Sequence, residues 1–276
     1  KLSVKAAVTG ADKDAVCVFE LKDDKGNVVA RDTRPSDAAE SVLEISSPRL
    51  WDGVKDPYLY TLYCAVVKNA KTVDERNIPV GFREIEFTSD KGCFLNGRHI
   101  KLKGVSRHQD REDIGNALTL KEHEEDIALI LEVGANSVRL AHYQQAEEFY
   151  SLCDKKGLLV WAEVPVISIY SKARQQNAEE QLTSLIKQNI NHPSIFCWSI
   201  GNEIIERKSP EAVITANALA GAVRRLDESR PVTSALAAWD SDWEIYDPLA
   251  AAHDITGYNY MIHKAESDHL RVPERI

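Results

Sequence analysis

The sequence predicts two folds in series, an antiparallel β-sandwich followed by an α/β unit built on a parallel sheet. Three observations lead to this prediction. Short runs of β-branched and aromatic residues, separated by turns and without a long helical pattern, fill residues 1–87. Strand-like and helix-like segments alternate from about residue 98 onward. Six strand-like segments follow one another in this way, and consecutive βα units place their strands in parallel with right-handed crossovers.

The first region contains a clear hairpin turn. Asp-Asp-Lys-Gly at 23–26 is a good turn sequence, in which Gly26 can adopt the positive φ that a tight connection needs. A second turn, Ser-Asp-Lys-Gly at 89–92, marks the end of the region, so we divide the chain into a sandwich domain, 1–87, and a second domain, 88–276. The strand-like runs of the first domain are residues 16–21, 27–30, 41–45, 58–67, 77–80 and 83–87.

The helices of the second domain have recognisable first and last residues. Thr119, with a glutamate three residues later, forms a capping box in front of an apolar helical stripe. Gly157 ends a helix over 146–156. Asn177 opens a third helix, and Ser209 followed by proline opens a fourth.

The strands of the second domain are short and apolar. Residues 158–164 are almost continuously apolar, as expected of a parallel strand that is covered on both faces. An eight-stranded barrel would need two more strands than the six present, so the prediction is an incomplete (β/α)8 barrel. The predicted strands are residues 100–107, 137–141, 158–164, 195–200, 231–236 and 255–260.

Composition excludes several classes of partner. The chain has 34 basic and 43 acidic residues and a formal charge of −9, which disfavours nucleic acid and anionic membranes as partners. It contains no apolar run of about 18 residues, so we expect no membrane-spanning helix. The first residues lack the apolar core of a secretion signal, and both the cytoplasm and the periplasm stay open as locations.

Cysteine, cofactor and metal chemistry have little support in the sequence. The five cysteines are scattered and lack Cys-x-x-Cys spacing, so we predict that they are reduced and structural. No phosphate-binding glycine loop and no Gly-x-Ser-x-Gly elbow is present, and we expect neither a cofactor nor a nucleophilic serine. The acidic residues at 122–126 belong to a helix start, and His263 and His269 lack a third ligand, so we expect no metal site.

Polar side chains gather at the C-terminal ends of the predicted strands. The buried strand within 191–203 is followed by Asn202 and Glu203. A barrel builds its active site where its strands end, and an Asn-Glu pair there can hold a sugar hydroxyl and protonate a glycosidic oxygen. The other candidates at strand ends, which we expect to line the same pocket, are His108, Arg139, His142, Glu163 and Tyr260.

Structural roles compete with functional ones for several of these residues. Arg139 can be a buried ion-pair partner, for example of Glu163, because charges inside barrels are usually paired. His142 can be a core histidine with satisfied nitrogens, and Tyr260 an ordinary strand tyrosine. Glu203 differs, because a carboxylate directly after an apolar strand has little structural purpose.

Several motifs together resemble the β-galactosidases of glycoside hydrolase family 2. One family signature resembles residues 136–161, which begin Asn-Ser-Val-Arg and end Gly-Leu-Leu-Val-Trp, and the other resembles residues 191–203. The segments 50–60 and 80–108 are also typical of the family. The resemblance covers nearly the whole chain. It implies an immunoglobulin-like β-sandwich followed by the first part of a TIM barrel.

The resemblance also implies residue roles. Glu203 would be the acid/base, and Asn202 would bind the sugar 2-hydroxyl. Tyr260 would resemble the tyrosine that hydrogen-bonds the nucleophile in the family. The residues that would line the sugar pocket are His108, Arg139 and His142.

The nucleophile of the family falls outside this sequence. In the family a glutamate at the end of the seventh strand attacks the sugar, and the resemblance places it beyond Ile276, whereas Glu266 and Glu274 precede that strand. We therefore expect this chain to be inactive by itself. We also expect the exposed edges of the first and sixth barrel strands to favour self-association.

The chain departs from the family pattern in three places. Gln144 follows His-Tyr where the family often has proline. Ile167 and Ile169 align with a Glu-x-His ligand pair of metal-dependent members, and isoleucine cannot coordinate magnesium. The N-terminal sugar-binding sandwich of the family is also absent from this sequence.

The function that the resemblance implies is retaining hydrolysis of terminal β-D-galactosides. A β-glucuronidase is the nearest alternative; it would need a cationic site for the sugar carboxylate, and Arg107-His108 is more typical of galactosidases. Another alternative is a non-catalytic carbohydrate-interaction module in which Glu203 is vestigial. An inverting glycosidase that uses Glu163 as base is a third.

Overall fold

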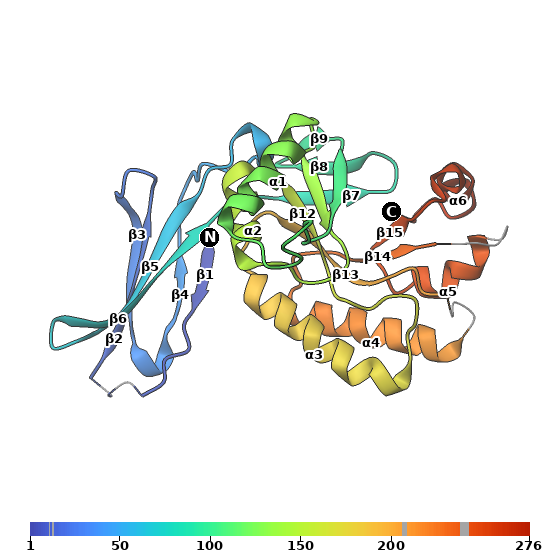
Figure 1. Ribbon diagram of the computed structural model, residues 1–276. Helices are drawn as coiled ribbons and strands as arrows, with labels where there is room; N and C mark the ends of the chain where they lie inside the picture. The colour runs from blue at the N-terminus through green and yellow to red at the C-terminus, as the bar shows by residue number, and fades with distance from the viewer. Residues whose placement is uncertain (11, 13, 206–208, 238–242) are drawn as a thin grey trace. The chain divides into compact units, whose positions relative to one another are not determined.

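The computed structural model describes residues 1–10, 12, 14–205, 209–237 and 243–276 (Figure 1). The chain forms two compact units. The first comprises Lys1–Asp52 and Asp56–Arg83, and the second comprises Gly53–Lys55 and Glu84–Ile276. Within the described ranges, no helix combines the length and the hydropathy that crossing a membrane requires.

The first unit contains two antiparallel sheets. Its strands are β1 (Leu2–Lys5), β2 (Val16–Lys22), β3 (Val28–Pro35), β4 (Glu40–Leu43), β5 (Tyr60–Lys68) and β6 (Lys71–Val80), with a short 3-10 turn at Ser36–Ala38. The larger sheet has the order β3-β2-β5-β6, and the smaller pairs β1 with β4. The predicted hairpin joins β2 to β3, and Gly26 has a φ of +82° at its turn.

The core of the first unit follows from the alternation along β2. Cys17, Phe19 and Leu21 are buried, and the residues between them are half-buried, as the period of a strand with one covered face requires. They pack with Leu43 of β4 and Leu62 of β5. Complete burial of a side chain such as Phe19 contributes roughly 2 kcal/mol.

The second unit begins with a three-stranded antiparallel meander. Its strands are β7 (Ile85–Thr88), β8 (Gly92–Leu95) and β9 (Arg98–Ile100). We expected 83–87 to be the last strand of the sandwich, but β7 pairs with β8 instead. The turn at 89–92 therefore joins two strands of one sheet.

A six-stranded parallel sheet follows, in the chain order β10-β11-β12-β13-β14-β15. The run 100–107, expected as one strand, is divided because β9 pairs with β8 and β10 pairs with β11. All residues of β13 are buried, as its apolar sequence predicts. The strands are β10 (Gly104–Arg107), β11 (Ser137–Leu140), β12 (Leu159–Glu163), β13 (Ile195–Asn202), β14 (Val232–Leu236) and β15 (Ile255–Tyr258).

Helices connect these strands, and α3 and α4 lie side by side (Figure 1). The helices are α1 (Leu120–Glu132), α2 (Glu147–Lys156), α3 (Lys172–Asn189), α4 (Pro210–Leu226), α5 (Asp247–Ala250) and α6 (Ala265–Arg271), with short 3-10 turns at Gly53–Lys55, Trp243–Tyr246 and Ile262–Lys264. The capping box before α1 is confirmed, since the Thr119 N–H donates to Glu122 (2.7 Å). The predicted start of α3 at Asn177 is wrong, since α3 begins at Lys172. The first turn of α3 is polar and contains no buried residue, so the hydrophobic pattern does not show where the helix starts.

Gly157 ends α2 as predicted, with a φ of +78°. Its lack of a side chain also has a packing reason. A β-carbon at this position would lie 2.2 Å from the backbone of Gly53, which belongs to the same unit. The glycine therefore permits both the left-handed conformation and a close backbone contact.

Candidate functional site

The ends of four strands bring one group of polar side chains together. Arg139 lies on β11, Glu163 ends β12, Asn202 ends β13, and Asn259 directly follows β15. His142 follows β11 and completes the group. We call these residues the Arg139 cluster: Arg139, His142, Glu163, Asn202 and Asn259. Parallel strands end at the same edge of the sheet, which explains how residues up to 120 positions apart meet there.

Glu163 is the fully buried anion of the cluster. Arg139 binds it through two bonds, Nε to Oε2 (2.9 Å) and Nη2 to Oε1 (3.0 Å). Trp161 Nε1 and Ser199 Oγ also donate to Oε2, both at 2.9 Å. His142 Nδ1 lies 2.6 Å from Oε1. Thus the ion pair between Arg139 and Glu163, one of the alternatives that the sequence left open, is present.

This surrounding keeps Glu163 ionised. Burial by itself would raise the pKa of Glu163, but the hydrogen bonds from His142 and Arg139 and the charge of Arg139 lower it below its usual value. A carboxylate with a lowered pKa and several donors on its oxygens is a poor proton acceptor. Glu163 is therefore suited to orienting its neighbours.

Arg139 also orients two side-chain amides. Its Nη2 donates to Asn202 Oδ1 (2.7 Å), and its Nη1 donates to Asn259 Oδ1 (3.2 Å). The guanidinium also lies over the Trp161 ring, 5.5 Å from the ring centroid. One fixed cation thus orients the side chains at the ends of two further strands.

Glu203 lies directly beside this cluster. Asn259 Nδ2 donates to its Oε1 (2.8 Å), and the Glu203 N–H donates to Ala235 O of β14 (2.7 Å). The hydrogen bond to Glu203 and the charge of that carboxylate raise the pKa of Tyr260. Glu203 and Tyr260 have φ values of +51° and +63°, an uncommon conformation for residues other than glycine that often accompanies function.

The remaining predicted residues lie at the margin of the group. The ring of His108 is exposed and meets the His142 ring edge-on, with centroids 5.3 Å apart. Tyr260 is 67% exposed. Arg107, in contrast, is buried and points elsewhere: it binds Asp126 (2.6 Å) and Gln145 and packs over the Phe149 ring.

Sequence reasoning missed three members of the site. Asn259 is one of the polar residues near the last predicted strand end, but only its bonds to Glu203 and Asn202 reveal its part. Trp161 and Ser199 lie within apolar strands and read as core residues until their bonds to Glu163 are seen. Their signal in the sequence was a polar atom inside a strand that is otherwise apolar.

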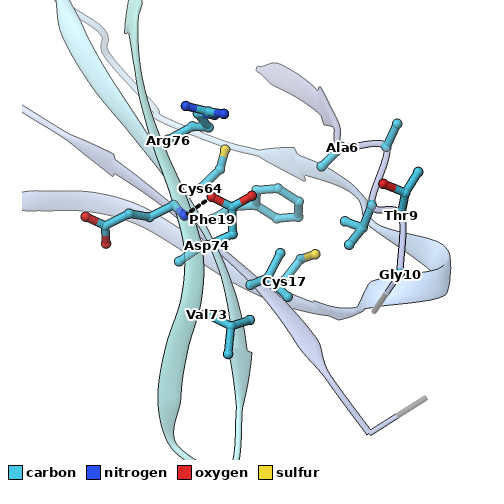
Figure 2. Close-up of a pocket in the computed structure, with 14 residues that line it drawn as sticks. Ala6, Thr9, Gly10, Cys17, Phe19, Cys64, Val73, Asp74 and Arg76 are labelled. Carbon is cyan, nitrogen blue, oxygen red and sulfur yellow. Dashed lines mark hydrogen bonds between the residues drawn. The ribbon is translucent and has the colours of Figure 1, made fainter. Parts of the chain in front are cut away.

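A separate pocket of about 380 Å³ lies in the first unit (Figure 2). Cys17 and Cys64 line it, together with Phe19, Asp74 and Arg76. Burial raises the pKa of Cys17, and burial with the neighbouring thiol raises the pKa of Cys64 to about 11. These thiols are protonated near neutral pH and are not nucleophiles. Among the described residues, no group of three or more His, Cys, Asp and Glu side chains could hold a metal ion.

Two family models match the chain. The model described as "Glycosyl hydrolases family 2, TIM barrel domain" matches residues 86–249, and the model "Glycosyl hydrolases family 2" matches residues 1–83. The first of these matches covers the parallel strands as far as β14 and includes Glu203.

Proteins named β-glucuronidase and proteins named β-galactosidase are both similar to this chain. A β-glucuronidase of Bacteroides fragilis is 43% identical over 204 residues, which are 70% of this chain and 29% of that protein. A β-galactosidase of Bacteroides ovatus is 31% identical over 87% of this chain and 33% of its own length. The crystal structure of an FMN-binding β-glucuronidase from F. prausnitzii L2-6 superposes with a TM-score of 0.92 at 34% identity, covering 99% of this chain and 44% of that one. The chain thus matches less than half the length of each of these three proteins.

Proposed function

Because the chain belongs to glycosyl hydrolase family 2, we propose that the natural protein carrying it hydrolyses β-linked glycosides, with Glu203 as the acid/base. One observation supports this role above the others. Glu203 directly follows β13, where the amides of Asn202 and Asn259 lie beside it. A carboxyl group next to an amide at this end of a barrel strand can protonate a glycosidic oxygen while the amide holds a sugar hydroxyl.

The mechanism we propose is retaining. A second carboxylate, about 5–5.5 Å from the first, attacks the anomeric carbon while Glu203 protonates the leaving oxygen. Glu203 then accepts a proton from the water that releases the sugar. We assign the nucleophile to a part of the natural protein outside residues 1–276, and we therefore expect this chain alone to be inactive. Asn202 binds the sugar 2-hydroxyl, and His108, His142 and Tyr260 line the pocket.

Glu163 is the obvious rival for the second carboxylate, and its surroundings argue against it. Arg139, Trp161 and Ser199 donate to its oxygens, and its pKa is lowered. A base or nucleophile needs a free lone pair and a path to the sugar. An inverting mechanism with Glu163 as base is therefore disfavoured.

The architecture fits the same proposal. We infer that the first unit is the immunoglobulin-like sandwich of the family, and that the six parallel strands are part of an eight-stranded barrel. The two further strands would then come from the rest of the natural protein, as the nucleophile would.

The sugar is either a galactoside or a glucuronide, and a different observation favours each. Arg139 is the cation of the described site, and it is already bound to Glu163, Asn202 and Asn259, which favours a neutral sugar such as galactose. A glucuronide would need another cation for its carboxylate. Two of the similar proteins are nevertheless β-glucuronidases. Arg107 does not decide the question, because it is bound to Asp126.

The test is hydrolysis of aryl β-galactosides and aryl β-glucuronides by the natural protein and its Glu203→Gln variant. Aryl leaving groups whose phenols differ in acidity distinguish proton donation by Glu203 from its other possible roles, because an acidic phenol leaves without help from a proton donor. For poor leaving groups we expect Glu203→Gln to lower kcat/KM by about 100-fold or more, with a much smaller loss for acidic phenols. Glu266→Gln, which changes an exposed glutamate of α6, is the matched control.

The outcomes separate the alternatives. Turnover of one sugar class and not the other identifies the substrate. A loss in Glu203→Gln that is equal for all leaving groups would contradict the acid/base role. Binding of a glycoside without turnover by the unaltered natural protein would favour the carbohydrate-interaction module.

A further inference from the structure

The side-chain amide of Asn259 has a fixed orientation. Its Oδ1 lies 3.2 Å from Arg139 Nη1. A guanidinium has donors only, so the atom of Asn259 that faces Arg139 must be the oxygen. The Nδ2 group is thereby directed to the two acceptors on its other side, Asn202 Oδ1 at 3.0 Å and Glu203 Oε1 at 2.8 Å.

The orientation of the Asn202 amide is fixed in the same way. Its Oδ1 accepts from Arg139 Nη2 (2.7 Å) and from Asn259 Nδ2 (3.0 Å). Its own Nδ2 is then the group that can donate to a ligand. Arg139 thus sets the orientation of both amides, and Asn259 connects that cation to Glu203.

Backbone bonds hold the two partners in register. The Glu203 N–H donates to Ala235 O (2.7 Å), and the Asn259 N–H donates to Leu236 O (2.8 Å). Both acceptors are adjacent carbonyls of β14. The contact between Asn259 and Glu203 therefore rests on one rigid strand, and a change of the Asn259 side chain leaves these backbone bonds in place.

We infer that Asn259 is a positioning residue that keeps Oε1 of Glu203 as a hydrogen-bond acceptor, so that the catalytic proton is carried by Oε2. This inference rests on the proposed function. The amide N–H favours the carbonyl oxygen of a protonated carboxyl group, which is the better acceptor, and the hydroxyl is left on the other oxygen. The phenol of Tyr260 can donate or accept, so it does not make this choice by itself.

The Oε2–H proton of Glu203 passes to the glycosidic oxygen, and the electron pair of the breaking C–O bond goes to that oxygen. Glu203 is left as a carboxylate, with the Asn259 N–H still on Oε1. In the second step water gives a proton back to Oε2 while its oxygen bonds to the anomeric carbon. The bond between that carbon and the nucleophilic carboxylate breaks, and its electron pair returns to the carboxylate.

The experiment compares Asn259→Ala and Asn259→Asp in the natural protein, using aryl glycosides with leaving groups of graded acidity. Alanine removes the whole contact. Aspartate keeps the shape and the acceptor for Arg139 but has no N–H for Glu203. We expect both variants to lose about 10- to 100-fold in kcat/KM on poor leaving groups and much less on acidic phenols. Asn217→Ala, in which the changed side chain is exposed on α4, is the control.

The leaving-group dependence separates positioning from other roles. If Asn259 acted only through Asn202 or through folding, every substrate would lose activity equally, and the inference would be overturned. Full activity of both variants would overturn it as well. Absence of hydrolysis by the unaltered natural protein would overturn the proposed function and this inference with it.

Discussion

Two ionisable side chains of the second unit, the buried Glu163 and the half-buried His253, are kept in opposite charge states. Glu163 is ionised because Arg139 and His142 outweigh the effect of its burial. His253 is neutral: its Nε2 meets Ser234 Oγ (3.0 Å), while its buried Nδ1 has no hydrogen-bond partner among the residues described. Burial lowers the pKa of His253 to about 4. Each residue avoids an unpaired buried charge, one by binding a counter-ion and the other by remaining deprotonated.

His253 predicts a pH dependence of stability. Its folded pKa, about 4, lies below the ordinary value of 6.5, so its contribution is fully present above pH 6.5 and is lost as the pH falls towards 4. Relative to His253→Gln, the free energy of unfolding of the wild type should fall by about 3 kcal/mol between pH 7 and pH 4. Urea unfolding measured by tryptophan fluorescence checks this.

The comparison of two variants removes the contribution of other groups. Carboxylates that titrate in the same range are common to both proteins and cancel in the difference. His269→Gln, which alters an exposed histidine, should leave the pH dependence unchanged. Parallel curves for the wild type and His253→Gln would show that burial does not suppress protonation of this histidine.

Among the elements, α1 and α2 are each followed closely by a glycine with positive φ, but the two glycines have different surroundings. Gly134 follows α1 with a φ of +77°, and Gly157 follows α2 with a φ of +78°. A β-carbon on Gly134 would have no atom within 4 Å, whereas one on Gly157 would meet the Gly53 backbone at 2.2 Å. Comparing the two positions therefore separates the free-energy cost of a left-handed conformation from the cost of steric overlap.

Alanine at the two positions should have unequal effects. Gly134→Ala should lower the free energy of unfolding by about 1 kcal/mol, the cost of a left-handed residue with a side chain. Gly157→Ala should cost about 2–4 kcal/mol, because overpacking is added. Denaturant titration of both variants measures the difference, and equal losses would mean that the contact between Gly157 and Gly53 relaxes without cost.

On the scale of the whole molecule, the parallel sheet has two ends. In the described part of the chain, β10 pairs only with β11 on one side, and β15 pairs with β14 on the other. One backbone bond reaches the outer edge of β15, from the Thr256 N–H to Ile276 O (2.6 Å). Exposed edges of this kind invite pairing with another chain.

The 276-residue chain by itself should therefore self-associate. Sedimentation velocity should show an average mass that rises with concentration, while the natural protein serves as the control because more of its sheet is covered in the proposed barrel. A constant monomer mass at high concentration would show that the edges are protected.

How far the sequence predicted the molecule depended on the kind of signal. Local signals were sufficient for β13, whose apolar run is fully buried, and for α1, whose capping box is formed. They failed at the start of α3, whose polar first turn contains no buried residue, and at β7, whose partner strand lies across a turn that resembled a boundary.

In the candidate site as well, local signals identified some residues, whereas contacts between distant segments were needed to identify others. Asn202 and Glu203 stood out because they follow an apolar strand, and the ion pair of Arg139 with Glu163 could be anticipated from burial. Asn259 could not be singled out, since its partners Arg139 and Glu203 lie 120 and 56 positions away. Which polar groups meet is decided by the register of strands, which no short segment encodes.

The Arg139 cluster also limits how this protein can change over evolutionary time. Arg139 serves a carboxylate, an imidazole and two amides at once. Replacing any one member leaves the others with unmet charge or hydrogen bonds, so the first mutational step is costly even when a compensating second step exists. His108 and Tyr260 are exposed and touch the cluster only at its margin, through the His142 ring and through Glu203. In the proposed glycosidase, new sugar preferences should therefore arise by substitution at such marginal positions, while the Arg139 cluster is inherited as one unit.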